Sequence, residues 1–261
     1  MQALGVAIGA VLSVVLAAVE ARADYPDRTI RMVVPFAPGG ANDSVARLVA
    51  DKLGKLLNQS VVVENRPGGG TVVGTAAVAA AKPGGYTLLL VSPAHTINPY
   101  INKSLPYDPL NDFTPIGQIT RSAYVLVTSP QSRFKAVGDF KPASQSGQQM
   151  SYASSGTGSA PHLAGALLAS LLGQTFVHIP YQGGGPAMVG IIRGDVDMYF
   201  SSGWYGIVGP ANLPADVTAK LSKAIEDILR DPELVARLQQ EGEEVAPSVA
   251  ETFGKLIRSD L

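Results

Sequence analysis

The sequence contains no cysteine, and this absence removes several kinds of site at once. Disulfide bonds, thiolate metal sites, cysteine nucleophiles and cysteine-linked lipid anchors all need a thiol. Histidine is also scarce: the chain has only His95, His162 and His178, far apart and without acidic residues at metal-ligand spacing. We therefore expect no metal centre, and no motif indicates another cofactor.

Charge of one sign is lacking as well. Twenty Lys and Arg residues face 21 Asp and Glu residues, giving a formal net charge of −1. A nucleic-acid binder usually carries a strong basic excess, so the balance argues against that class. The chain also lacks a G-x-S-x-G elbow and any nucleophile–base set. We therefore do not expect an enzyme.

One long apolar run occurs, at the N-terminus from Leu4 to Val19. It is followed by Ala21-Arg22-Ala23, which fits a small-x-small cleavage site. We interpret residues 1–23 as a signal peptide that is removed on export. The alternative is a membrane anchor, but the run is short for a span and charged residues close it.

The remaining chain predicts an α/β protein. Hydrophobic residues make up 46% of it and charged residues 16%, enough for a sizeable core. Apolar runs predict alternating strands and helices, and hence a parallel sheet covered by helices. The expected strands are 29–34, 61–64, 86–91, 150–153, 176–179 and 196–200, and the expected helices are 44–57, 71–81, 159–172, 186–192, 215–230, one opened by Asp231-Pro232, and 249–259. The β-type runs 116–128 and 203–208 are expected to cross between two lobes.

The stretch "VVPFAPGGANDSVARL" joins a strand to a helix through two prolines and two glycines. Proline stiffens such a loop, and glycine lets the backbone approach a ligand. The helix then presents unpaired N–H groups and the positive end of its dipole, which favour an anion. The alternative is a tight turn with an ordinary helix cap. The candidate binding residues here are Phe36, Ala37, Pro38, Gly39, Gly40, Ala41 and Asn42.

A second loop, "SSGTGSAPHL", repeats this arrangement before another helix. Its candidate residues are Ser154, Ser155, Gly156, Thr157, Gly158 and Ser159. Two such loops in two lobes would close around one small anion, whereas the alternative is two unrelated turns. Ser92 and His95 follow a strand end, where ligand crevices form in open α/β sheets. The glycine-rich "ENRPGGGTVVG" lacks the G-K-[ST] ending of a phosphate loop, so we interpret it as structural, with Glu64 and Arg66 paired.

Taken together, these segments resemble one known family over nearly the whole mature chain. The resemblance is to the TctC or Bug (Bordetella uptake gene) family, the periplasmic substrate-binding proteins of tripartite tricarboxylate transporters. It is carried by "YPDRTIRMVVPFAPGGANDSVARLVADKL", "VVVENRPGGGTVVGTAAVAAAKPGGYTLLL", "INPYINKSLPYDPLNDFTPIGQI", "MSYASSGTGSAPHLAGALL", "VHIPYQGGGPAMVGIIRGDVDMYF" and "GWYGIVGPANLPADVTAKL".

The resemblance implies a two-lobed periplasmic-binding-protein type II fold, with residues 24–120 and 205–261 in lobe 1 and residues 121–204 in lobe 2. It implies a periplasmic monomer that captures a small carboxylate, without cofactor or catalysis, and delivers it to the transporter's membrane subunits. The two loops would hold the ligand, Ser92 and His95 would lie at its rim, and Tyr181 in "PYQGGGPA" would line the cleft.

The chain departs from the family pattern after "DVDMYF". Phe200 is joined directly to Ser201, and a loop, a helix and a strand that the family carries there are absent. Between residues 134 and 150, Pro142 also interrupts an expected helix. We therefore expect a shortened second lobe with an uncovered sheet edge. The alternative function is that of a degenerate or repurposed member with impaired ligand binding.

Overall fold

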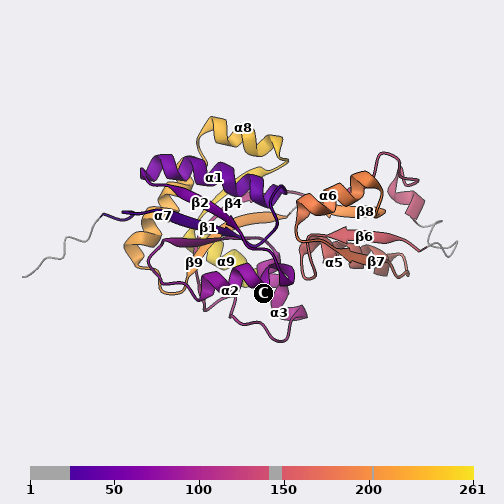
Figure 1. Cartoon of the computed structure of the whole chain (residues 1–261), viewed down its shortest axis with the longest axis horizontal. Helices are drawn as coiled ribbons and strands as arrows, with labels where there is room; N and C mark the ends of the chain where they lie inside the picture. Colours follow the sequence, from indigo (N-terminus) through magenta and orange to yellow (C-terminus); the bar gives the residue numbers. More distant parts are fainter. Residues whose placement is uncertain (1–23, 141–148, 202) are drawn as a thin grey trace, which may run out of the picture.

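The computed structural model describes residues 24–140, 149–201 and 203–261, which form two lobes lying side by side (Figure 1). The signal peptide predicted for residues 1–23 lies outside the described residues. So do residues 141–148, which include Pro142. The two-lobed α/β fold predicted from the sequence is confirmed, and each lobe is built on its own sheet.

The larger lobe contains a six-stranded sheet in the order β10-β4-β9-β3-β1-β2. The three strands nearest one edge are parallel, as predicted, whereas β9 is antiparallel to both β3 and β4. The strands are β1 (Ile30–Val34), β2 (Val61–Asn65), β3 (Thr87–Val91), β4 (Phe113–Arg121), β9 (Trp204–Pro210) and β10 (Glu244–Val249).

Helices cover both faces of this sheet, because each buries one apolar stripe. In α1 (Ala41–Leu57) the stripe includes Val45, Val49 and Leu53, spaced one helical turn apart. It packs in one core with α7 (Ala215–Ile228) and α8 (Pro232–Gln240). The opposite face carries α2 (Val72–Ala79) and α9 (Ala250–Asp260). The predicted N-cap of α8 is confirmed, since Asp231 accepts a hydrogen bond from the Glu233 N–H.

The smaller lobe has a four-stranded sheet in the order β5-β8-β6-β7. Its helices α5 (Ala160–Leu171) and α6 (Gly184–Arg193) lie in two separate apolar clusters. The strands are β5 (Val125–Val127), β6 (Ser151–Ser154), β7 (Val177–Pro180) and β8 (Met198–Ser201). Strand β5 lies at one edge of this sheet beside β8, and Val125 on it is 55% exposed.

Two short connections join the lobes. The chain leaves the larger lobe after β4 and returns to it at β9. Arg121 and Trp204 are paired opposite each other at the ends of these strands. The Ser122 N–H donates a hydrogen bond of 2.7 Å to the Gly203 carbonyl, so the two crossings are tied together at the hinge.

Candidate functional site

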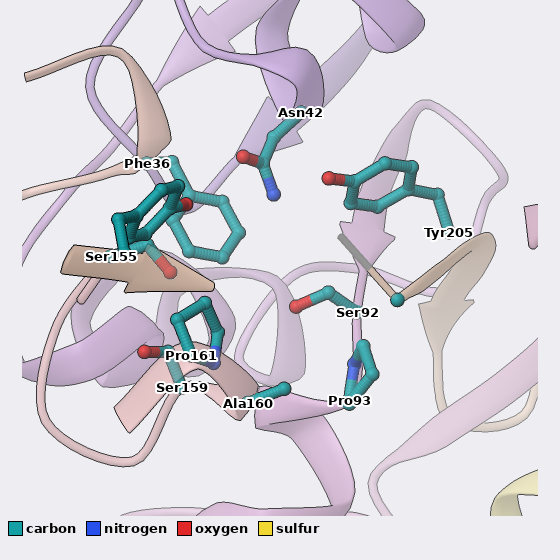
Figure 2. A pocket seen from close by; sticks show the side chains of 11 residues that line it. Phe36, Asn42, Ser92, Pro93, Ser155, Ser159, Ala160, Pro161 and Tyr205 are labelled. Carbon is teal, nitrogen blue, oxygen red and sulfur yellow. The ribbon is translucent and has the colours of Figure 1, made fainter. Parts of the chain in front are cut away.

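A narrow cleft lies between the lobes (Figure 2), and its cavity volume is about 30 Å³. The larger lobe contributes side chains from the β1–α1 loop, from α1, from the end of β3 and from β9. The smaller lobe contributes the β6–α5 loop, the start of α5 and β8. The lining residues are Phe36, Asn42, Ser92, Pro93, Ser155, Ser159, Ala160, Pro161, Tyr199, Gly203 and Tyr205.

The start of α1 is held by a buried carboxylate. Asp43 accepts hydrogen bonds from the Gly39 N–H and from the side chains of Arg47 and Asn65. Burial acts to raise the pKa of Asp43, but these hydrogen bonds outweigh it and hold that pKa below its usual range. Asp43 is therefore ionised and already satisfied, and its role is to fix the loop rather than to contact a ligand.

The first N–H groups of α1 remain available. Within the described residues, no acceptor lies at hydrogen-bond distance from the N–H of Ala41 or Asn42, in accordance with their place in the first turn. These groups combine with the positive end of a 17-residue helix at the cleft. This end of the cleft is suited to a carboxylate.

Four buried polar side chains face the cleft without a partner. Asn42 is 7% exposed, Ser92 8%, Tyr199 4% and Tyr205 5%. None of their side chains hydrogen-bonds to another described residue. Burial raises the pKa of Tyr199 to about 12. Burial and the nearby Glu243 raise that of Tyr205 well above 10. Both phenols therefore stay protonated and can donate a hydrogen bond into the cleft.

The second loop uses most of its own donors internally. The Gly156 N–H donates to Ser154 Oγ, the Ser159 N–H to the Gly156 carbonyl, and the Gly158 N–H to His162 Nδ1. Pro161 removes a further N–H from the first turn of α5. The smaller lobe therefore contributes hydroxyl groups and an apolar wall more than backbone donors.

Two stacked histidines support this loop from behind. His178 Nε2 lies 2.7 Å from Ser154 Oγ, and the rings of His162 and His178 are 4.1 Å apart. Burial lowers the pKa of both rings, and for His178, to which His162 adds repulsion, it falls to about 4. The pair is therefore neutral at pH 7, which lets His162 Nδ1 accept the loop hydrogen bond.

The structure brings only part of the predicted set to the cleft. Phe36, Asn42, Ser92, Ser155 and Ser159 line it. Among the others, Ser154 is fully buried, and Gly156, Thr157 and Tyr181 line a neighbouring cavity together with Gly68–Thr71. The residues of the first loop that do not line the cleft are Ala37, Pro38, Gly39, Gly40 and Ala41, and Gly158 of the second loop does not line it either.

His95 lies inside the larger lobe and not at the rim. Its ring is buried between Tyr107 and Phe113, and its Nε2 is 2.9 Å from the Pro109 carbonyl. The sequence analysis placed His95 at the rim because it follows the end of a strand. The structure shows that α3 (Ala94–Ile101) begins there at once and turns His95 inward.

Several lining residues were not predicted. Tyr199 and Tyr205 lie in strands whose residues are nearly all apolar, so the sequence does not mark which side chains reach the cleft. Pro93, Ala160 and Pro161 are neighbours of predicted residues and carry no polar group of their own. Gly203 lies at the hinge, which the sequence places only approximately.

The lobes touch directly beside the cleft, through backbone. The Ala37 N–H donates a 2.7 Å hydrogen bond to the Gln182 carbonyl of the smaller lobe. A Cβ at Gly40 would lie 2.7 Å from the Gly185 nitrogen, closer than side-chain carbons approach backbone. Gly70 meets the Thr157 carbonyl in the same way. The structure is thus a closed form, and glycines make the closure possible.

Comparison with known proteins identifies the chain. Residues 45–202 match the model of the tripartite tricarboxylate transporter family receptor, TctC. The chain belongs to the TctC family. The match covers more than half of the 261 residues and ends where this receptor returns to its larger lobe. Members of this family are solute-binding proteins.

Relatives extend the match over most of the receptor. A UPF0065 protein of Pseudomonas sp. strain P51 is 29% identical over 90% of this chain and 84% of its own length. That alignment is 282 positions long, longer than this chain, so the relative carries residues that this receptor lacks. The structure of the periplasmic binding protein BugD is similar with a TM-score of 0.86 and 28% identity, over 90% of this chain and 95% of BugD. MatC from Rhodopseudomonas palustris with bound malate matches with a TM-score of 0.83 and 26% identity, over 90% and 97%.

Two further observations concern other kinds of site. No cluster of three potential metal-ligating side chains occurs among residues 24–140, 149–201 and 203–261. Within the same ranges, none of the helices has the length and apolar character needed to span a membrane.

The burial of His95 predicts a pH dependence of stability. Burial lowers the pKa of His95 to about 4, from an ordinary value of about 6.5. Between these values the unfolded chain binds more protons than the folded one, so the free energy of unfolding decreases as the pH falls. One proton corresponds to about 1.4 kcal/mol per pH unit.

We expect His95→Gln to lower this slope by about 1 kcal/mol per pH unit, because glutamine does not titrate. Urea unfolding at pH 6.5, 5.75 and 5.0 measures it. The slopes are compared between the two proteins, so a constant loss of stability in the variant does not affect the result. Equal slopes would show that His95 does not titrate in this window.

Proposed function

We propose that this protein is an extracytoplasmic receptor that captures a small carboxylate between its two lobes and delivers it to the membrane subunits of a tripartite tricarboxylate-type transporter. The observation that carries the proposal is the cleft itself. It combines the N–H groups at the start of α1 with four buried polar side chains, none of which hydrogen-bonds to another described residue. A carboxylate supplies the acceptor atoms that these groups need.

The hinge geometry supports capture by closure. We take residues 24–120 with 205–261 as one jaw and residues 121–204 as the other, and the two tied crossings connect them as a hinge. A ligand that contacts both jaws stabilises the closed form over the open one. Closure also removes water from the donors around the carboxylate, which strengthens each hydrogen bond.

The comparisons support the ligand class and the destination. The matched family is named for tripartite tricarboxylate transport, and MatC, with the same fold, holds malate. We infer that residues 1–23 direct export and that the mature receptor works as a monomer in the periplasm. Neutral donors rather than cations hold the anion, since no lysine, arginine or histidine is among the lining residues.

A thermal-shift screen tests the proposal. The mature chain is heated with mono-, di- and tricarboxylates at millimolar concentration. A ligand present at 100 times its Kd adds about 2.7 kcal/mol of stability, so at least one acid should raise the Tm by several degrees. The matching amides, which lack the charge, serve as controls and should have no effect. No shift with any acid would contradict the proposal.

The second candidate is a degenerate member that no longer binds. It is favoured by the residues that this chain lacks relative to its relatives and by the exposed edge strand β5. Against it, the smaller lobe retains two buried apolar clusters. Urea unfolding of the mature chain separates the two candidates. A broad, non-cooperative transition would favour degeneration, and a sharp transition together with a ligand-induced shift would exclude it.

A further inference from the structure

Asn42 is the lining residue whose chemistry demands two different partners. A carboxamide carries both an acceptor oxygen and an NH₂ donor, unlike the hydroxyls around it, which can rotate. Figure 2 shows the Asn42 side chain pointing into the cleft. The residue is 7% exposed, and neither polar atom of its side chain hydrogen-bonds to a described residue. A ligand that satisfies only the donor leaves a buried carbonyl unpaired.

The position of Asn42 indicates which part of a bound carboxylate its side chain would meet. It is the second residue of α1, in the same turn as the free N–H groups. The other helix end in the cleft is a poorer anion site, since Pro161 and the internal hydrogen bonds of its loop remove donors. The carboxylate is therefore best placed at the start of α1. The Asn42 carboxamide then faces the carbon next to that carboxylate.

The charges around the cleft limit which substituent the ligand can carry on the carbon next to its carboxylate. None of the lining residues is acidic. The carboxylate of Asp43, next to Asn42 in the chain, is already bonded to Gly39, Arg47 and Asn65, and that of Glu243 acts on Tyr205 at the other side of the cleft. An ammonium group at this carbon would lose its water without gaining a counter-charge. A plain CH₂ group would leave the Asn42 oxygen unpaired. A hydroxyl group both donates and accepts, and satisfies the carboxamide.

We propose that Asn42 makes this site selective for 2-hydroxy carboxylates. The inference rests on the proposed function, since it assumes that a carboxylate binds at the start of α1. The ligand hydroxyl donates to Asn42 Oδ1, and Nδ2 donates to the hydroxyl oxygen or the adjacent carboxylate. Losing one buried hydrogen bond of this kind corresponds to roughly a tenfold loss of affinity or more.

Two matched sets of probes test the selectivity by isothermal titration calorimetry at pH 7.5. Malate, succinate and aspartate share a four-carbon skeleton and differ only in the hydroxyl, hydrogen or ammonium on carbon 2. Lactate, propanoate and alanine make the same comparison with three carbons. Both enantiomers of each chiral acid are used. In the wild-type protein we expect one hydroxy acid to bind at least tenfold more tightly than its deoxy and amino counterparts.

The variant Asn42→Leu, similar in size but without polar atoms, should bring the hydroxy-to-deoxy ratio to within about threefold. Asn42→Ser, too short to reach the same place, should do likewise and guards against misfolding of the first variant. A loss of structure would weaken all the acids together and leave the ratio unchanged.

Wild-type protein that binds the deoxy or amino acids as well as the hydroxy acids would overturn the selectivity and leave the proposed function standing. A ratio that survives in both Asn42 variants, when their ligand-free urea unfolding matches that of the wild-type protein, would overturn the assignment to Asn42. If none of the acids binds the wild-type protein, the proposed function fails, and the inference with it.

Discussion

Replacing Gly40 with valine should lower the affinity for the bound carboxylate by between about tenfold and 100-fold. In the closed form a Cβ at this position would lie 2.7 Å from the Gly185 nitrogen, and backbone atoms on both sides leave little room to adjust. Overpacking of this kind costs about 1–3 kcal/mol. The cost falls on the closed form alone, because the two glycines separate when the lobes open. Because the ligand binds the closed form, the measured affinity falls in proportion to the population of that form.

The measurement is titration calorimetry with the acid that gives the largest thermal shift. Gly185→Val approaches the same contact from the smaller lobe, where a Cβ would lie 2.7 Å from the Gly39 carbonyl carbon, and should behave alike. Gly138→Val is the matched control, since a Cβ there meets no atom of the described residues within 4 Å. Ligand-free stability should change little in all three variants. Full affinity in both contact variants would show that the ligand is held without this closure.

Replacing Phe253 with alanine should lower the free energy of unfolding by about 3–5 kcal/mol, the range for deleting a buried aromatic ring. Phe253 is fully buried on α9, its ring fills the space above Gly206 of β9, and it meets Trp204 edge to face. The cavity would open beneath the strand that returns from the smaller lobe. Urea unfolding without ligand measures the loss.

Lys255→Ala on the same helix provides the comparison. Lys255 is exposed and pairs with Glu251 one turn away, an interaction worth less than about 0.5 kcal/mol at a surface. A loss below about 1 kcal/mol for Phe253→Ala would mean that α9 does not stabilise the larger lobe.

Much of the fold could be predicted because hydrophobic spacing and helix-capping residues along the sequence indicate its helices and strands. The stripe of Val45, Val49 and Leu53 predicts α1, and Asp231 before Pro232 predicts the start of α8. Two elements were missed where proline hides the pattern. Pro99 lies inside α3, and Pro247 lies in β10 near an irregularity in its pairing with β4. The antiparallel direction of β9 depends on distant partners, and no local sequence reports it.

The candidate site was predictable only to the level of the loop. Glycines before a helix mark a place where backbone donors meet a ligand, and Asn42, Ser155 and Ser159 do reach the cleft. Which side chains turn inward depends on packing. Ser154 is drawn to His178 and His95 to the Pro109 carbonyl, so chemically suitable groups face away from the cleft. Tyr199 and Tyr205 reach it from strands that the sequence marks only as apolar.

The pairing of Arg121 with Trp204 makes the smaller lobe a long loop between two neighbouring strands. Its entry and exit are already adjacent, so segments can be gained or lost within it without moving any strand of the larger sheet. This explains how a chain that lacks residues present in the Pseudomonas relative keeps an architecture similar to that of BugD. The larger lobe acts as a fixed frame, and the inserted lobe is the part of the receptor that evolution can trim, extend or exchange to suit a new solute.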